Sequence, residues 1–260
     1  MSDLNLVQTK VNYGAVWILA RRELMEFWRN KSRVISSLAQ GILFLFVFGA
    51  GFSNIDIEMG GVIVDSRAFT ASGIAAMVIL FTGIFGGMSV FRDKMFGFMK
   101  ELMVAPVSRR TIMLGRTVGV ALQTMIQVII MITLGVLFGY FGYDLSLIWR
   151  VMLILPVAFL SSLGIVGIGL TISTRLKDMQ SFGLIQTFIV MPMMWLSGTI
   201  IPLPTMITMF NPFTYCVDLF RFVLIGVSYF PFWLDIIVAG LFGSVLIIIG
   251  AQSFNKMEVS

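Results

Sequence analysis

The chain contains no histidine, a single cysteine and few charged side chains. Without histidine it lacks the commonest zinc ligand and the commonest general base in proteins. The lone cysteine, Cys216, excludes an internal disulfide framework. Only 12% of the 260 residues are charged, about half the share usual in soluble domains, whereas 58% are hydrophobic. So few charges could not cover the surface of a soluble fold, and lipid is the solvent that this composition fits.

A phosphate-binding loop is also missing, because no Gly-x-x-x-x-Gly-Lys-Ser/Thr sequence occurs. The chain should therefore not bind ATP by that route. An intramembrane enzyme without histidine would need paired aspartates or a Ser/Lys dyad inside the spans. The aspartates fall instead in outer loops or at the ends of expected spans: Asp56, Asp65, Asp144, Asp218 and Asp235. We therefore do not expect an enzyme, and we expect no cofactor or metal bound by this chain.

Apolar runs long enough to cross about 30 Å of hydrocarbon recur along the chain. A lipid-facing backbone must satisfy its own hydrogen bonds, so each run should be helical. Continuous apolar runs, without alternation, disfavour a β-barrel. The sequence predicts an all-α integral membrane protein with one transmembrane domain over residues 34–253, and Pro156 is expected to kink its fourth span. The six expected spans cover residues 34–52, 72–91, 111–139, 147–173, 182–200 and 232–251.

Lys and Arg are distributed unevenly between the two sides of these spans. Fifteen of the 18 fall on the side of the N-terminal segment, and three fall on the other side: Arg67, Arg150 and Arg221. By the positive-inside rule this places both termini in the cytoplasm, which requires an even number of spans. The net charge of +5 then reflects cytoplasmic loops and does not indicate nucleic acid binding. The first residues lack the apolar core of a cleaved signal peptide, and we expect none.

Residues 1–33 form an expected cytoplasmic segment that is amphipathic in its second half. Its apolar residues recur at spacings of three and four, which places them on one face of a helix: Tyr13, Val16, Trp17, Ala20, Leu24, Phe27 and Trp28. The charged residues lie largely off that face: Arg21, Arg22, Glu23, Glu26 and Arg29. The segment is too polar to span, so it predicts a helix lying in the cytoplasmic interface near lipid phosphates. It is either a plain anchor or also a contact for a cytoplasmic partner.

A second amphipathic segment follows the second expected span, in residues 92–107. Met95, Phe98, Met99 and Leu102 are spaced as one face of a short helix that ends before Pro106. The charged residues of the segment are Arg92, Lys94, Lys100 and Glu101. Flexible Met side chains adapt to grooves on other proteins, so this face suits a docking contact. The alternative is a helix that merely lies on the membrane.

Prolines interrupt the chain between the start of the fifth expected span and the last span: Pro192, Pro202, Pro204 and Pro212. Asn211-Pro212 is a helix-start signal. Residues 202–229 are predicted to form short helices that dip into the outer leaflet, which is tolerated only where protein covers them or a cavity adjoins them. Asp218 and Arg221 are spaced to form an ion pair on one helical face. A substrate contact is the alternative for these two residues.

Polar and small residues within the spans carry weaker signals. Four glutamines lie within or near spans and should face protein or water: Gln40, Gln123, Gln127 and Gln186. Helix packing is the first interpretation of these four, and contact with a transported molecule is the second. Three Gly-x-x-x-Gly pairs would permit close helix packing, although several are expected by chance among 25 glycines: Gly83 with Gly87, Gly115 with Gly119, and Gly135 with Gly139.

Four features in this order resemble one family over nearly the whole length. They are the amphipathic N-terminal helix, the Gly97-Phe-Met-Lys-Glu-Leu-Met-Val-Ala-Pro-Val-Ser segment, Leu196-Ser-Gly198 with the prolines after it, and Asn211-Pro-Phe-Thr-Tyr with Asp218 and Arg221. Together they resemble a membrane permease subunit of the ABC-2 type exporter family, in the branch that includes drug-resistance and nodulation-factor export permeases.

The resemblance implies a set of partners and a location. Two permease subunits, identical or paralogous, would bind two cytoplasmic ATPase subunits that hold ATP and Mg²⁺, in the plasma (inner) membrane of a prokaryote. Residues 92–107 would form the coupling helix that docks on the ATPase, and the re-entrant helices would close the outer face. ATP would then shift the spans between inward-facing and outward-facing states.

The nature of the substrate stays open at this stage. A pathway with few charges suits an amphipathic small molecule, a drug or a lipid-like compound. Export of a polysaccharide or glycolipid is the alternative within the family. An ATP-independent channel or secondary transporter is the alternative outside it, although such proteins usually carry charged residues at mid-membrane depth, and the spans here have almost none.

Overall fold

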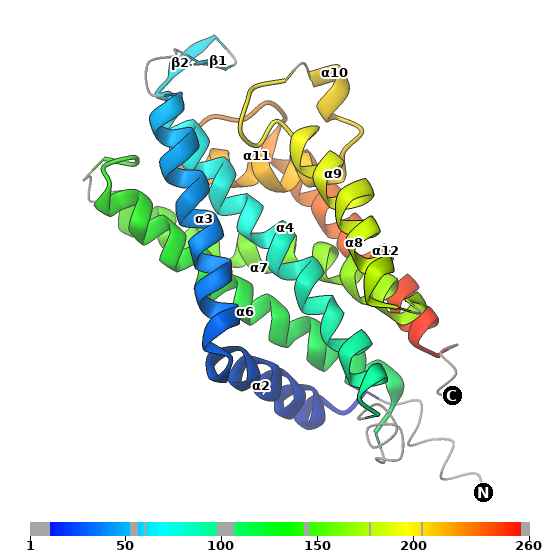
Figure 1. Ribbon diagram of the computed structural model, residues 1–260. Helices are drawn as coiled ribbons and strands as arrows, with labels where there is room; N and C mark the ends of the chain where they lie inside the picture. Colours follow the sequence, from blue (N-terminus) through cyan, green and yellow to red (C-terminus); the bar gives the residue numbers. More distant parts are fainter. Residues whose placement is uncertain are drawn as a thin grey trace, which may run out of the picture.

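The computed structural model describes residues 11–52, 57–59, 61–97, 107–142, 146–176, 178–203 and 205–255. In this part of the chain nearly all regular structure is helical, and the long helices form a bundle (Figure 1). The sheet described there is a two-stranded antiparallel hairpin of β1 (Ile57–Met59) and β2 (Val62–Val64), with Ile57 opposite Val64. The expected all-α class is confirmed, with this small hairpin as its one departure among the described residues.

Five helices in the described part of the chain are long and apolar enough to cross a membrane. They are α3 (Lys31–Gly51), α4 (Ser66–Met95), α6 (Arg109–Leu137), α7 (Ser146–Arg175) and α12 (Phe232–Asn255). Their ranges overlap five of the six expected spans, and α7 continues through Pro156 as one helix. Six crossings stay a prediction, because residues 182–200 have a different structure.

The fifth expected span is a broken helix. α8 (Met179–Ile185), the π-helical turn η1 (Gln186–Val190) and α9 (Met191–Trp195) follow one another directly. Pro192 lies in the first turn of α9 and has no N–H, so the carbonyl four residues earlier loses its α-helical partner. In the π turn, the Met191 N–H instead donates to the Gln186 carbonyl, five residues back. The sequence showed the apolar run and the interrupting proline, but it did not predict the π turn.

Asp178 begins α8 as its N-terminal cap. Its carboxylate accepts a 2.7 Å hydrogen bond from the Ser181 N–H. This hydrogen bond lowers the pKa of the exposed Asp178 carboxyl below its ordinary value. A lowered folded-state pKa means that the cap contributes stability above the ordinary pKa of aspartate and loses it as the pH falls through the folded-state value.

α4 is the central helix of the bundle, with almost all of its side chains buried against α3, α6, α7 and α11 (Pro212–Ile225). Glycines allow α7 to approach it closely. A Cβ added to Gly83 would lie 2.7 Å from Cγ2 of Ile165, and one added to Gly87 would overlap the backbone of Gly169. The Gly83-x-x-x-Gly87 pair is therefore a helix-packing motif, as the sequence suggested.

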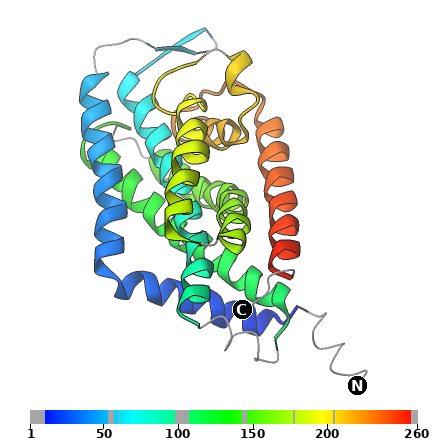
Figure 2. The same ribbon diagram turned by 45° about the vertical axis from the view of Figure 1, so that its right-hand side comes forward.

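α2 (Tyr13–Arg29) lies across the end of the bundle at which α3 begins and α12 ends (Figures 1 and 2). It packs on α6, where a Cβ added to Gly119 would lie 2.7 Å from Cβ of Glu23. Trp17 and Trp28 are exposed on the outer side of α2, whereas Phe27 is buried against protein. The predicted helix is present, and part of its apolar face is buried against protein while another part is exposed.

Glu23 is the main departure within α2, because it lies buried among charged residues of other helices. Its Oε1 is 3.6 Å from a guanidinium nitrogen of Arg116 on α6, and Arg116 also pairs with Asp93 on α4. Arg116 donates a 3.1 Å hydrogen bond to the hydroxyl of Ser89, and Arg22 lies 3.8 Å from Asp93. Two arginines and two carboxylates therefore connect α2, α4 and α6. The charges of α2 were expected to lie largely off its apolar face, and Glu23 is the one that is buried in the packing.

This network predicts the effect of removing Arg116. We expect Arg116→Met to lower the free energy of unfolding by about 3–5 kcal/mol, because it removes a buried cation that pairs with two carboxylates, Glu23 and Asp93. Unfolding of the purified protein in mixed micelles would measure the loss. Arg110→Met is the matched control, because Arg110 is an exposed arginine on the same helix and should change stability by less than about 0.5 kcal/mol. Equal stability of both variants would contradict a structural role for the network.

Candidate functional site

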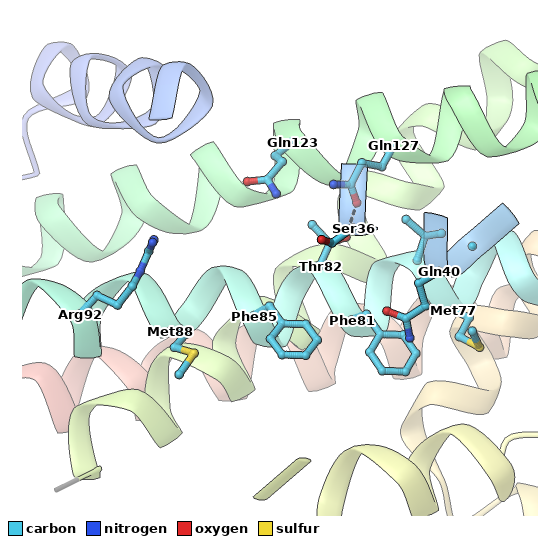
Figure 3. A pocket seen from close by; sticks show the side chains of 12 residues that line it. Ser36, Gln40, Met77, Phe81, Thr82, Phe85, Met88, Arg92, Gln123 and Gln127 are labelled. Atoms are coloured by element: carbon cyan, nitrogen blue, oxygen red, sulfur yellow. Dashed lines mark hydrogen bonds between the residues drawn. The ribbon is translucent and has the colours of Figure 1, made fainter. Parts of the chain in front are cut away.

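A cavity of about 340 Å³ lies between α3, α4 and α6 (Figure 3). Its volume falls in the range of about 300–1,000 Å³ that is typical of small-molecule sites. α3 contributes Ser36, Gln40 and Gly41 to its walls, and α6 contributes Gln123 and Gln127. α4 supplies the remaining lining residues and forms its longest wall.

Three of the four glutamines noted in the sequence line this cavity. Gln40 comes from α3, and Gln123 and Gln127 come from α6 (Figure 3). The hydroxyl of Thr82 on α4 donates a hydrogen bond to Oε1 of Gln127. Gln186 is half-buried in η1 and is not part of this cavity. The amides give a transported molecule neutral donors and acceptors inside an otherwise apolar space.

The α4 wall is an apolar stripe. Met77, Phe81, Phe85 and Met88 are spaced four, four and three residues apart, which places them on one helical face over about 16 Å. The rings of Phe81 and Phe85 are stacked with centroids 6.2 Å apart, and the Phe85 ring lies 5.6 Å from that of Phe182 on α8. Amide and aromatic groups in one cavity suit a molecule that has both polar and apolar parts.

The end of α4 carries the first residues of the expected coupling segment. Arg92, Lys94 and Met95 lie in the last turn of α4, with Met95 exposed and Arg92 lining the cavity. The short separate helix that the sequence predicted lies outside the described residues. So do six of the residues singled out there: Phe98, Met99, Lys100, Glu101, Leu102 and Pro106.

At the opposite end of the bundle, α10 (Thr205–Thr208) and α11 form short helices after the prolines. α11 begins at the predicted signal: the Asn211 side chain accepts a 3.0 Å hydrogen bond from the Phe213 N–H, and Pro212 is the first residue. The Asn211 amide also donates a 2.6 Å hydrogen bond to the Met193 carbonyl of α9. α11 packs on α4, α7 and α12, so protein covers it, as short helices at membrane depth require. Pro202 is exposed, and Pro204 lies outside the described residues.

Arg221 of α11 does not pair with Asp218. Its guanidinium donates hydrogen bonds of 2.6 Å and 3.0 Å to the carbonyls of Gly198 and Thr199, and it lies 3.7 Å above the ring of Phe69 on α4. Gly198 has a φ of 68°, in the left-handed region that favours glycine, and this conformation belongs to the turn that presents its carbonyl. Arg221 therefore connects α11, the turn after α9, and α4.

Asp218 satisfies its charge with backbone groups instead. Its two carboxylate oxygens accept hydrogen bonds of 3.0 Å and 2.8 Å from the Tyr229 N–H, and one accepts a 2.9 Å bond from the Phe230 N–H. Among the described ion pairs, none joins Asp218 to Arg221. The predicted ion pair is therefore wrong. The three-residue spacing permits the contact, but each of the two side chains hydrogen-bonds to backbone groups of an adjoining turn.

Asp235 is a buried acidic residue that the sequence interpretation placed at a span end. It lies in the first turn of α12 with no exposed surface. Neither of its carboxylate oxygens has a hydrogen-bond partner among the described residues. Leaving a buried carboxylate unsatisfied is costly, so this residue reduces the stability of the fold. Its position after an ordinary loop gave no sequence signal of this burial.

The Asp235 environment makes a second stability prediction. We expect Asp235→Asn to raise the melting temperature in micelles, because it keeps the side-chain shape and removes a buried acidic group that has no hydrogen-bond partner among the described residues. Asp65→Asn is the matched control: Asp65 caps α4 by accepting a 2.8 Å bond from the Arg67 N–H, and asparagine caps equally well. A loss of stability in Asp235→Asn, with Asp65→Asn unchanged, would show that the acidic group itself is required.

Comparisons with known proteins agree with this arrangement. The family model for the ABC-2 type transporter matches residues 14–225, which includes every helix described above except α12. A protein of Pyropia yezoensis named as a transport permease, ycf38, is 26% identical over 227 residues, or 81% of this chain and 74% of the relative. Nodulation protein J of Rhizobium leguminosarum bv. trifolii is 25% identical over 228 residues, 83% of this chain and 82% of the relative.

A third relative carries a name that mentions resistance. A Mycobacterium tuberculosis protein named as a doxorubicin resistance ABC transporter permease, DrrC, is 27% identical over 152 residues, 56% of this chain and 54% of the relative. The family match covers most of the chain, and the resemblance seen in the sequence is confirmed. The chain belongs to the ABC-2 type transporter family.

Proposed function

We propose that this chain is the permease subunit of an ATP-driven exporter, and that the cavity between α3, α4 and α6 lies on the path of its substrate. The cavity is the observation that carries the proposal. It places stacked phenylalanine rings and glutamine amides along one space between three helices of the bundle. Such a surface suits an amphipathic small molecule, a drug or a lipid-like compound. The names of the drug-resistance and nodulation relatives support transport of molecules of that general kind.

The energy source in this proposal is a separate protein. The chain has no phosphate-binding loop, and ABC-2 permeases associate with an ABC ATPase subunit. Two ATPase subunits that hold ATP and Mg²⁺ would dock on residues 92–107 of two permease subunits, identical or paralogous. With six crossings, both termini would lie in the cytoplasm of a prokaryotic cell, and the permease would lie in its plasma (inner) membrane. The uneven distribution of Lys and Arg supports that orientation.

The transport role is tested by reconstitution with the ATPase. We expect proteoliposomes that contain both proteins to move amphipathic fluorescent dyes only when ATP is present. Phe85→Ala should lower the rate, because it removes the ring at the middle of the stripe. Phe188→Ala is the control, since Phe188 is exposed on η1 outside the cavity. Transport without ATPase would favour a channel or secondary transporter, and equal rates in both variants would remove the cavity from the pathway.

The docking role of residues 92–107 is tested separately. Replacing Phe98, Met99 or Leu102 with glutamate should reduce permease-stimulated ATP hydrolysis to the rate of the ATPase alone. The reason is that a charge on the apolar face of the expected helix opposes its burial in a partner groove. Membrane insertion, measured by the amount of folded protein extracted, should stay at the wild-type level. Full stimulation in all three variants would contradict the assignment of this segment.

A further inference from the structure

The charge of the cavity is asymmetric. Arg92 is the one charged residue among those that line it in the described part of the chain. It lies one helical turn beyond Met88, at the end of the apolar stripe where α2 crosses the bundle (Figure 3). Its neighbour Asp93 pairs instead with Arg116 and Arg22, and no described carboxylate forms an ion pair with Arg92.

A guanidinium in this position is suited to bind an anion. Arginine offers a planar set of donors that matches carboxylate, sulfate and phosphate groups. The other polar groups of the cavity are neutral amides and hydroxyls, which accept and donate without a preference for charge. The preference of the cavity for one sign of charge therefore depends on Arg92 alone among these lining residues. A cationic group at the same place would be repelled more strongly than in water, because the surroundings are apolar.

The position of Arg92 also fixes the orientation of a bound molecule. From Arg92 to Met77 the α4 wall extends over 15 residues, or about 22 Å, and the four apolar residues of the stripe occupy the part beyond Arg92. A charged group held by Arg92 would thus leave an apolar chain or ring system lying against Phe85 and Phe81. The Lys and Arg distribution assigns this end of α4 to the cytoplasm, so the head group would face the cytoplasm.

We propose that the cavity between α3, α4 and α6 selects amphipathic molecules with one negatively charged head group, which Arg92 binds while the apolar body lies along the stripe. This names the substrate class of the same cavity and therefore rests on the proposed function. The shared chemistry covers both an anionic phospholipid of the bilayer and an acidic amphiphile from the cytoplasm. The test below separates these two sources.

The experiment compares three probes that share one body. Dansyl-labelled undecanoic acid, its methyl ester and the corresponding dansyl-labelled undecylamine are titrated against the full chain in nanodiscs of phosphatidylcholine, with empty nanodiscs subtracted. We expect the acid to bind about tenfold or more tightly than the ester, as for a hydrogen-bonded charge, and the amine to bind most weakly. Addition of phosphatidylglycerol to the disc then tests the source: displacement of the acid identifies a bilayer lipid, and no displacement identifies a soluble amphiphile.

Substitutions test which residue causes the preference for the acid probe. Arg92→Gln should remove the advantage of the acid over the ester, and Arg92→Lys should restore part of it. Lys94→Gln is the matched control, because Lys94 lies in the same last turn of α4 but does not line the cavity, and it should bind like the wild type. Phe85→Ala should weaken all three probes by a similar factor. Size-exclusion profiles show that each variant is folded.

The outcomes are separable from those of the proposed function, because equilibrium binding needs neither ATP nor the ATPase. Equal binding of acid and ester to the wild type, or equal losses in Arg92→Gln and Lys94→Gln, would overturn the charge preference. If the complex exports the ester or amine with ATP and does not prefer the acid, the inference fails and the exporter assignment stands. If the cavity prefers the acid but the complex exports no probe, the exporter assignment fails instead.

Discussion

Two buried arginines hold the two ends of the central helix, and the cavity depends on both. At one end Arg116 contacts Asp93 and Ser89 of α4. At the other end Arg221 lies over Phe69 of α4 while it binds the carbonyls of the turn after α9. Each guanidinium is almost completely buried, so its donors must be matched by protein groups. The terminal nitrogens of both guanidinium groups bind protein acceptors, although neither Nε has a partner among the described residues. These contacts connect α4 to α2 and α6 at one end, and to α11 at the other.

Between these two ends α4 has room to face a cavity. On the side of α4 that faces α7, Gly83 and Gly87 allow the backbones of the two helices to approach closely. This side of α4 is tightly packed and does not line the cavity. On the side of α3 and α6 it presents Met77, Phe81, Phe85 and Met88. Methionine and stacked phenylalanine tolerate ligands of varied shape. The same helix thus packs closely against α7 on one side and presents side chains that can adapt to a ligand on the other.

The sequence predicted those parts of the fold that depend on local backbone preferences or on the length of an apolar segment. Apolar length located five long helices, and Asn211-Pro212 located the start of α11. Their polarity within or near apolar spans singled out four glutamines, of which Gln40, Gln123 and Gln127 line the cavity and Gln186 does not. By contrast, the burial of Glu23 and Asp235 depends on neighbours distant in the sequence, which no local pattern shows.

The partners of Asp218 and Arg221 illustrate the same limit. Their three-residue spacing was real, but the competing backbone groups belong to turns at residues 198–199 and 229–230. Likewise, the sequence indicated that Pro192 would interrupt a straight helix, but it did not predict that a π turn would form there. A proline in an apolar run permits a kink, a break or a π turn, and the choice depends on how the rest of the helix packs.

The π turn of η1 gives the helix formed by α8, η1 and α9 one residue more than α-helical geometry needs. Releasing that residue would rotate one part of the helix against the other by about 100°, the angle per residue of an α-helix. Such a rotation would carry Phe182, which contacts the stripe through Phe85, to another position relative to α9. A change of a few backbone hydrogen bonds could in this way reshape the side of the cavity, with no movement of α4 itself.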